Sequence, residues 1–415
     1  MKRVVITGLG AITPIGKNVK QYWENLLKGI SGANKITRFD ASKFKTQFAC
    51  EIKDYDALDY FDRKEARKLD RFSQYGLISA EEAIKDANLD FSKLDTNRIG
   101  VIFSSGIGGF ETFEKEIIDY TNGNFNPRFN PFFIPKIISN GLSGIISINN
   151  GLRGVNYCPV TACASSTQSI IQSFNYIRLG KADIIIAGGS EAPITESSIG
   201  GFNAMKAMST NNENFSSASK PFDTNRDGFV VGEGAGALVI ESLDSALKRN
   251  ANIYAEIVGG GESSDAYHIT GTHPEGLGAY LAMENGIKEA KITPNEIEYI
   301  NAHATSTGLG DLSEIKAIER LFKSSIEKVQ ISASKSMTGH LLGGTGAIEA
   351  ISTCLSVKTD LIPPTINTTE IDKNIPKELN LSLGETSSKK VNYALSNSFG
   401  FGGHCSAMIL KKYVG

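Results

Sequence analysis

The sequence has few of the features that mark secreted, metal-binding or membrane-spanning proteins. Its five cysteines are irregularly spaced and include no Cys-x-x-Cys pair, which argues against a disulfide framework and a zinc ribbon. No apolar run approaches the roughly 18 residues that a membrane span requires. The net charge of −2 argues against bulk binding of nucleic acid. We therefore expect a cytoplasmic protein that binds neither nucleic acid nor membrane.

What is present is a large globular composition, 40% hydrophobic and 21% charged. A chain of 415 residues exceeds the usual size of one hydrophobic core, so two domains or two fused halves are expected. The 42 glycines exceed the average share of roughly 7% and indicate many turns and close backbone approaches.

Strand-like and helix-like segments alternate along the chain. The segment RVVITGLG near the N-terminus and residues 98–109 each predict a strand that ends in a glycine turn, and residues 181–191 form an apolar run typical of a strand buried on both faces. The segment RFSQYGLISAEEAIKDANL between them has an amphipathic helical pattern. This alternation predicts an α/β fold in which helices cover sheets.

The two ends of the chain have a similar rhythm. Residues 228–242 and 398–412 each show an aromatic, a glycine turn and an apolar strand, and residues 252–261 would open a second half as RVVITGLG opens the first. In each half a small-residue turn opens a helix before this strand, at Cys163 in the first and near His340 in the second. We therefore predict two related halves, residues 1–250 and 251–415.

Cys163 lies between a small-residue turn and a helical pattern. Apolar side chains recur with helical spacing over residues 164–179, and Gly180 fits the position just after a helix end. A cysteine at the start of a helix lies at the positive end of the helix dipole, which favours the thiolate and presents N–H groups to an anion. The residue is therefore either a nucleophile or, like most free cysteines, a small buried apolar group.

Two of the five histidines stand at similar junctions. His303 ends an apolar run and precedes a polar turn, and His340 lies among glycines shortly after Lys335. α/β folds build their sites at such junctions, and a cysteine with two histidines suits nucleophilic catalysis. A metal site is less favoured, because no His-Glu-x-x-His motif or cysteine cluster accompanies the histidines.

Four motifs, TACASS, NAHATST, KSMTGH and NSFGFGG, occur in this order from residue 161 to residue 403. With them the chain closely resembles the β-ketoacyl-acyl carrier protein synthases over essentially its whole length, and the elongating type II enzymes best. The second histidine excludes the initiating type, which has Cys-His-Asn. The resemblance implies a thiolase-like fold, with two pseudo-symmetric halves in five layers α-β-α-β-α, and a homodimer.

The resemblance also implies an acyltransferase with a decarboxylative Claisen condensation that elongates fatty acids by two carbons and requires no cofactor. Cys163 would take the acyl chain from the carrier protein, as a thiol of depressed pKa. His303 and His340 would donate hydrogen bonds to the enolate of the malonyl group, and Lys335 would orient the His340 region. The backbone N–H groups of Cys163 and Phe401 would form the oxyanion hole.

The resemblance alone gives further residues their roles. The gating loop would contain Phe399 and Phe401, and the pantetheine arm would meet Thr305 and Thr307. The acyl pocket would be lined by Ile107, Phe133 and Phe202. The acidic carrier protein would dock on Lys64, Arg67, Lys68, Arg128 and Lys206. A structural monovalent cation, found in some relatives, would lie at Asn301, Glu349, Ser396 and Asn397. Cys405 stands where the family usually has asparagine, as a second reactive thiol or a buried one.

Three other functions compete with that of an elongating synthase. A polyketide or aryl-polyene ketosynthase shares all four motifs and stays as the alternative. A non-catalytic chain-length factor would lack the cysteine that Cys163 supplies. A nucleotide-binding role for TGLGAITPIG has little support, because the segment has no Gly-x-Gly-x-x-Gly pattern. Acyl-chain length, preference for unsaturation and pathway stay open at this point.

Overall fold

The structure is a computed structural model that describes residues 1–415, apart from the side chain of residue 324. Its main strands form one continuous sheet in the order β12-β10-β9-β14-β15-β8-β1-β7-β6-β4-β5. These strands are β1 Val4–Ile12, β4 Ile99–Ser104, β5 Asn156–Tyr157, β6 Ile184–Glu191, β7 Gly234–Ser242, β8 Ala255–Ser264, β9 Tyr299–Asn301, β10 Gln330–Ser332, β12 Asn380–Leu381, β14 Tyr393–Gly400 and β15 His404–Lys411. Two short ribbons pair β2 Asn34–Lys35 with β3 Phe48–Ala49, and β11 Leu361–Ile362 with β13 Ser387–Ser388.

The helices alternate with these strands along the chain. They are α1 Val19–Leu27, α2 Arg63–Ala66, α3 Arg71–Asp86, α4 Phe110–Asn122, α5 Phe133–Ile137, α6 Gly141–Asn150, α7 Ser165–Arg178, α8 Glu196–Ala204, α9 Leu243–Lys248, α10 Leu277–Ala290, α11 Gly308–Phe322, α12 Lys335–Thr338 and α13 Thr345–Thr359. Short 3-10 turns precede two of them, η4 Ala162–Ala164 before α7 and η8 Leu342–Gly344 before α13.

The strand order repeats across the centre of the sheet. In the first half β1 and β6 are antiparallel to β7, and β4 is parallel to both β6 and β5. In the second half β8, β15, β14, β9 and β10 repeat the same sequence of antiparallel and parallel pairs. The halves join where β1 pairs with β8. The predicted α/β fold with two related halves is confirmed, and the predicted boundary near residue 250 falls between α9 and β8.

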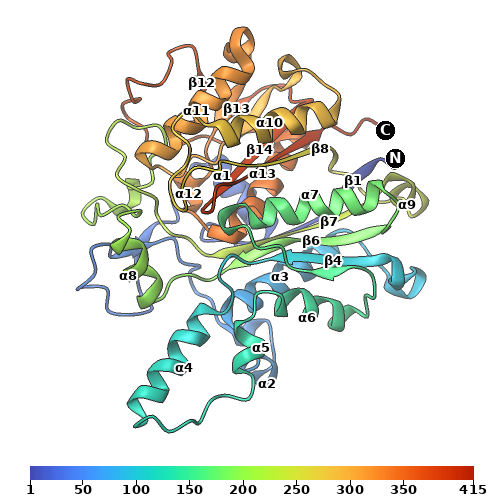
Figure 1. Cartoon of the computed structure of the whole chain (residues 1–415). Helices are drawn as coiled ribbons and strands as arrows, with labels where there is room; N and C mark the ends of the chain where they lie inside the picture. Colours follow the sequence, from blue (N-terminus) through green and yellow to red (C-terminus); the bar gives the residue numbers. More distant parts are fainter.

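The sheet folds over so that its two halves enclose a central pair of helices (Figure 1). α7 and α13 contact strands of both halves, whereas α3 and α6 cover the outer face of the first half and α10, backed by α11, covers that of the second. The layers therefore run helix, sheet, helix, sheet, helix, as expected. The two chain ends lie near each other at one edge of the molecule (Figure 1).

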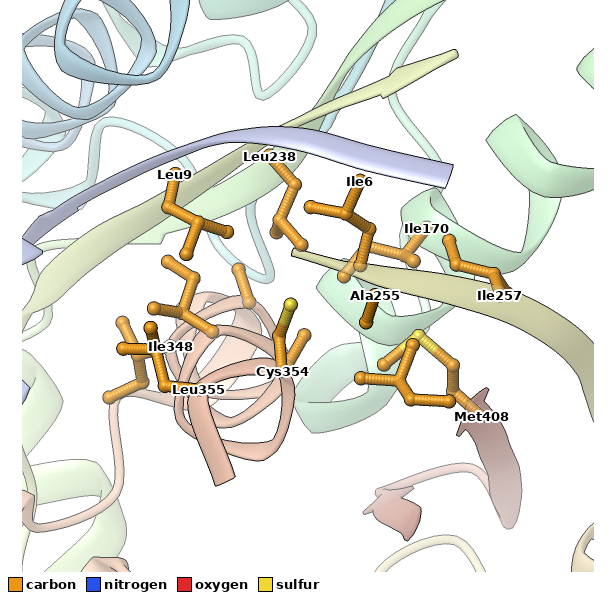
Figure 2. Close-up of a cluster of buried hydrophobic side chains, with 14 of the residues drawn as sticks. Ile6, Leu9, Ile170, Leu238, Ala255, Ile257, Ile348, Cys354, Leu355 and Met408 are labelled. Atoms are coloured by element: carbon orange, nitrogen blue, oxygen red, sulfur yellow. The ribbon is translucent and has the colours of Figure 1, made fainter. Parts of the chain in front are cut away.

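The central layer is packed with apolar side chains from α7, from α13 and from strands of both halves (Figure 2). Ile170 of α7 and Ile348 of α13 are fully buried, and they meet Ile6 of β1 and Leu238 of β7 from one half and Met408 of β15 from the other. Full burial of one such side chain is worth about 1.5–3 kcal/mol. This packing fixes the start of both central helices, which is where the candidate site lies.

Glycines in the first strand of each half let a helix lie directly on the backbone. A Cβ at Gly10 would stand 1.9 Å from the Ser79 carbonyl of α3, and one at Gly261 would stand 1.9 Å from the Ala282 carbonyl of α10. The prediction that the N-terminal strand ends at its glycines is therefore wrong: β1 continues through them to Ile12, because they serve helix packing and not a turn.

Outside the layers, α4, α5 and the loop between them project from the first half (Figure 1). Their surface is unusually apolar, with several large side chains at least 38% exposed: Phe113, Ile117, Ile118, Phe125, Phe129, Phe132 and Ile134. Among the described residues, no helix is both long and apolar enough to cross a bilayer.

Candidate active site

Cys163 stands on the η4 turn, immediately before the central helix α7. Its side chain is 8% exposed and lines a cavity of about 330 Å³ together with both predicted histidines. The turn of β14 into β15 approaches it closely, since a Cβ at Gly400 would lie 2.5 Å from the Thr161 carbonyl and 3.0 Å from the Cys163 nitrogen. Only glycine at position 400 lets this segment pass so close to the backbone before Cys163. The close approach brings the Phe401 N–H to the Cys163 sulfur.

The sulfur is surrounded by opposing influences. Burial raises the pKa of the Cys163 thiol to about 12. The Lys335 ammonium lowers this pKa, the Glu191 carboxylate raises it, and the N–H groups of Phe401 and of Cys163 itself lower it. The structure thus differs from the sequence-based expectation of a depressed pKa, because loss of water outweighs the nearby charge and donors. The resting thiol keeps its proton, so the proton must leave as the sulfur attacks.

The two histidines reach the cavity from separate segments. His303 follows β9, and the N–H groups of His303 and Ala304 donate to the Glu314 carboxylate of α11 at 2.9 and 2.8 Å. The backbone of His340 exchanges hydrogen bonds with that of Val230 and Gly232, at 2.7 and 2.9 Å. His340 was expected to open a helix, but it lies in this bridge, and α13 begins only at Thr345.

The histidine rings lie edge to face, with centroids 5.4 Å apart. Burial and the Lys335 cation lower the pKa of both well below the ordinary histidine value, and His340 adds to this effect on His303. Both imidazoles are therefore neutral near pH 7, and each carries one N–H. Nδ1 of His340 lies 3.0 Å from the Thr345 hydroxyl, which leaves Nε2 to donate into the cavity when that hydroxyl is the donor.

Lys335 lies behind the cavity wall in a fully buried ion pair. Its ammonium is 2.6 Å from Glu349 Oε1, and the two side chains are 1% and 0% exposed. Burial raises the pKa of Glu349 to about 7, against the lowering effect of Lys335 and the Ser334 hydroxyl. The lysine acts on the cysteine and the histidines through its charge.

The residues predicted for the gating loop and the pantetheine arm, and two of the three predicted for the acyl pocket, line the same cavity. Thr305 and Thr307 face each other with hydroxyls 3.1 Å apart, and Phe399 packs edge-on against His303. Ile107 and Phe202 also line the cavity. Cys405 lines it too, but it is 3% exposed, and burial raises the pKa of its thiol.

Phe133 and the predicted docking residues lie elsewhere in the chain. Phe133 of α5 stacks on Phe113 and Phe129, at ring distances of 6.2 and 5.5 Å, and does not line the described cavity. The predicted basic residues are all exposed and form separate groups: Lys64, Arg67 and Lys68 on and after α2, Arg128 between α4 and α5, and Lys206 after α8, between the cavity-lining residues Met205 and Ala207.

The four residues predicted to hold a cation are buried and share one feature. Each has a side-chain oxygen without a hydrogen-bond partner among the described residues: Asn301 Oδ1, Glu349 Oε2, Ser396 Oγ and Asn397 Oδ1. No group of three or more histidine, cysteine, aspartate or glutamate side chains in the described chain could hold a metal ion. Neutral oxygens with one carboxylate suit a hard cation better than a transition metal.

Several polar residues of the site were missed by sequence reasoning. Glu314 holds the His303 backbone, and Glu191 binds the backbone of the cavity turns at Gly106 and Gly343. Arg226 donates to the carbonyls of Thr307 and Gly308. A lone charged residue in a sequence does not reveal that its partners are backbone groups, so only the three-dimensional arrangement identifies these roles.

Family models match almost the whole of this framework. The model described as "Beta-ketoacyl synthase, N-terminal domain" matches residues 1–246, and "Beta-ketoacyl synthase, C-terminal domain" matches residues 254–369. The chain is 49% identical over 415 residues to a 3-oxoacyl-(acyl-carrier-protein) synthase 2 of Staphylococcus aureus (strain COL), covering 99% of each chain. It is 45% identical to the Synechocystis sp. protein of the same name, covering 99% of this chain and 98% of the other.

Solved structures agree on the fold. A beta-ketoacyl synthase from Burkholderia phymatum superposes with a TM-score of 0.92 at 32% identity, covering 100% of both chains. A type II PKS ketosynthase, solved in complex with its acyl-carrier protein and bound to the hexaketide, gives a TM-score of 0.92 at 32% identity, covering 99% of this chain and 100% of that one.

The charge on Lys335 predicts the reactivity of Cys163. Lys335→Met removes a cation that lowers the thiol pKa, and a nearby opposite charge typically shifts a pKa by about 1–3 units. At a fixed pH near 8 the thiolate fraction, and with it the rate of alkylation of Cys163 by iodoacetamide, should fall roughly tenfold or more. Mass spectrometry of the Cys163 peptide over time gives this rate.

Lys358→Met is the matched control for this measurement. Lys358 lies near the end of α13, where its ammonium donates to the Ile253 carbonyl at 2.7 Å, and it does not line the cavity. Its loss should leave the alkylation rate unchanged. An unchanged rate in a folded Lys335→Met variant would contradict an electrostatic role of Lys335.

Proposed function

The chain belongs to the β-ketoacyl synthase family, and we propose that it acts as a 3-oxoacyl-acyl-carrier-protein synthase of fatty-acid elongation. The observation that carries this function is that Cys163, His303 and His340 line one cavity. A polyketide ketosynthase is the second candidate, since such an enzyme shares the fold. Fatty-acid elongation is favoured because the named fatty-acid synthases are 45–49% identical, against 32% for that ketosynthase.

The first step transfers an acyl chain to Cys163. The sulfur attacks the carbonyl carbon of the acyl thioester, the carrier's C–S bond breaks, and the thiol proton passes to the departing carrier thiolate. Negative charge develops on the carbonyl oxygen in this step. The N–H groups of Cys163 and Phe401, which already act on the sulfur, are placed to receive that oxygen.

The second step forms the new carbon–carbon bond. The malonyl thioester loses carbon dioxide, and negative charge moves to its thioester oxygen. His303 and His340 each offer one N–H to that oxygen. The resulting carbanion attacks the acyl carbonyl on Cys163, the bond to the sulfur breaks, and a 3-oxoacyl thioester two carbons longer leaves on its carrier. The sulfur departs as a thiolate and takes up one proton from solvent, which restores the resting thiol.

The carrier partner is an acyl carrier protein. The related type II PKS ketosynthase was solved in complex with one. An acidic carrier suits the exposed basic residues on and after α2, where Lys64, Arg67 and Lys68 form a compact group. Such charges accelerate association and make it sensitive to salt.

The assembly we propose is a homodimer. β5 is the last strand of its sheet edge, and an open edge favours pairing with another chain. Beside it Ile148 is 79% exposed and Val160 is 53% exposed, and the apolar surface of α4 and α5 lies on the same half. A symmetric dimer would cover these surfaces. It would also bring Phe133 to the acyl pocket of the partner subunit, whereas Phe133 does not line the cavity of its own subunit.

A structural monovalent cation is part of the proposal. The unpartnered oxygens of Asn301, Glu349, Ser396 and Asn397 would hold it, because buried polar atoms without partners are costly. The ion would supply positive charge beside Glu349, opposite the oxygen that binds Lys335. No step of the reaction depends on it.

Replacement of the nucleophile separates the two chemical steps. Cys163→Gln cannot accept an acyl group, so no acyl adduct and no condensation should be detectable. The amide resembles an acylated cysteine in shape, and both histidines remain, so release of carbon dioxide from malonyl carrier protein should continue. Mass spectrometry of the protein and measurement of carbon dioxide test these outcomes.

Cys405→Ser is the control, and it should keep both activities. An acyl adduct that persists on Cys405 in the Cys163→Gln variant would refute the assignment of the nucleophile. Loss of decarboxylation in a folded Cys163→Gln variant would count against separate roles for the thiol and the histidines.

Charge reversal tests carrier docking. Changing Lys64, Arg67 and Lys68 to glutamate should raise KM for the acyl carrier protein roughly tenfold or more, because like charges then face each other. Activity on small pantetheine thioesters should change little. Steady-state rates at two salt concentrations provide both KM and its salt dependence.

The same reversal at Lys93, Lys288 and Lys316 is the matched control, since these exposed lysines lie on other elements and the net charge changes equally. Equal effects from the two triple variants would mean that net charge and not a docking surface is responsible. Equal losses of activity on the carrier-protein substrate and on the small pantetheine thioesters would mean that the reversal has disturbed the cavity.

Ion exchange tests the cation. Protein dialysed into tetramethylammonium chloride should gain a few degrees in melting temperature when potassium chloride replaces that salt, because an ion that binds only the folded state stabilises it. Asn301→Leu should abolish this potassium-dependent gain, while Asn374→Ala, at an exposed position, should keep it. A gain of equal size in Asn301→Leu would contradict the site.

A further inference from the structure

Glu191 is a buried carboxylate that the mechanism above does not use. It is the last residue of β6, and its side chain is fully buried. Its Oε1 accepts hydrogen bonds from the Ser105 hydroxyl at 2.6 Å and the Ile107 N–H at 3.1 Å. Its Oε2 accepts from the N–H groups of Gly106 at 2.7 Å and Gly343 at 2.9 Å.

These donors come from two turns on opposite halves of the molecule. Ser105, Gly106 and Ile107 follow β4 of the first half, whereas Gly343 lies in η8 of the second, just after His340. The turns touch at this point, since a Cβ at Gly343 would lie 2.3 Å from the Gly106 nitrogen. No strand partner serves these N–H groups, so the carboxylate is what holds the two turns together.

Both turns form a wall of the catalytic cavity. Gly106 and Ile107 line it from one side and Leu342 from the other, while Glu191 itself does not line it. Among the described residues Glu191 has no ion-pair partner, so its charge is balanced only by N–H and O–H donors. Its contacts therefore suit the fixing of backbone position better than contact with a substrate.

We propose that Glu191 is a positioning residue that sets the acyl-chain specificity of the enzyme, by fixing the Ser105–Ile107 turn against the Leu342–Gly344 turn. The inference rests on the proposed function, because it assigns the wall to the acyl chain carried by Cys163. The carboxylate holds Ile107 at a fixed place in that wall. A long chain must pass this side chain, whereas a short chain ends near the sulfur.

Glu191→Gln tests the proposal with little change of shape. The amide keeps one acceptor oxygen, but its NH2 group faces N–H donors and loses their hydrogen bonds. Hydrogen bonds to charged groups are the stronger ones, so we expect roughly a tenfold fall in kcat/KM for dodecanoyl relative to butyryl carrier protein. Carbon dioxide release from malonyl carrier protein, which needs no acyl chain, should fall much less.

Two further variants distinguish positioning from general stability. Glu233→Gln changes another fully buried glutamate, which pairs with the Arg38 guanidinium, accepts from the Ile52 N–H and the Tyr75 hydroxyl, and does not line the cavity. It should lower the melting temperature without altering the dodecanoyl-to-butyryl ratio. Ser105→Ala removes one donor of Glu191 and also the acceptor of the Gly108 N–H at 3.0 Å, and it should lower the ratio about threefold. It carries the test alone if Glu191→Gln does not fold.

The outcomes separate this inference from the proposed function. If the wild-type protein transfers neither acyl group to Cys163, the proposed function fails. If the wild type is active, the dodecanoyl-to-butyryl ratio of folded Glu191→Gln is compared with the wild-type ratio. A ratio within about twofold of the wild-type value refutes the positioning role. Ser105→Ala takes the place of Glu191→Gln if the latter does not fold. An equal change of the ratio in Glu233→Gln would also refute the positioning role, because the effect would then be a general one.

Discussion

One buried ammonium group acts on every member of the catalytic set. Lys335 is 1% exposed, and its ammonium group pairs with the Glu349 carboxylate at 2.6 Å. Its field lowers the pKa of His303 and of His340, in the same direction as burial, and opposes the effect of burial on the Cys163 thiol. The lysine thus acts on three groups that it need not touch.

Burial and the Lys335 charge both lower the pKa values of His303 and His340, so both rings are neutral near pH 7. The neutral state suits the proposed chemistry. An imidazolium ion beside an enolate is a strong enough acid to protonate it, and a protonated enolate can no longer attack the acyl group. A neutral imidazole donates a hydrogen bond to the developing charge but keeps its proton. In the proposed mechanism two such donors, His303 and His340, would stabilise the carbanion without protonating it. The site therefore needs its cation close enough to act on the rings and separated from the substrate.

The repeated fold explains how these groups meet. Each half contributes a 3-10 turn before its central helix, and Ala162 and Leu342 at the starts of these turns share a left-handed backbone, with φ of 50° and 46°. The first half supplies the cysteine from this turn. The second half supplies both histidines. Because α7 and α13 lie side by side between the sheets, the two turns open into one cavity.

Much of this arrangement was predictable from sequence, and the exceptions have physical reasons. The helix expected over residues 164–179 is α7, followed by Gly180 with a φ of +72°, because its apolar spacing and its end signal agree. The convergence of Cys163, His303 and His340 followed from their motifs. The pKa of the thiol did not, because burial of one sulfur depends on the whole surrounding chain. Phe133 is a second exception to the sequence-based prediction, because it does not line the cavity of its own chain.

The buried glutamates missed by sequence reasoning support the glycine-containing turns of the cavity wall. Gly106, Gly400 and Gly403 line the cavity beside large side chains such as Phe202 and Phe229. Such turns leave N–H groups without strand partners, and unpaired buried N–H groups are costly. A carboxylate can accept about four hydrogen bonds. Glu191 accepts from both turns beside Ile107, and Glu314 accepts from the backbone of His303 and Ala304. These carboxylates hold their turns in place from behind the wall of the cavity.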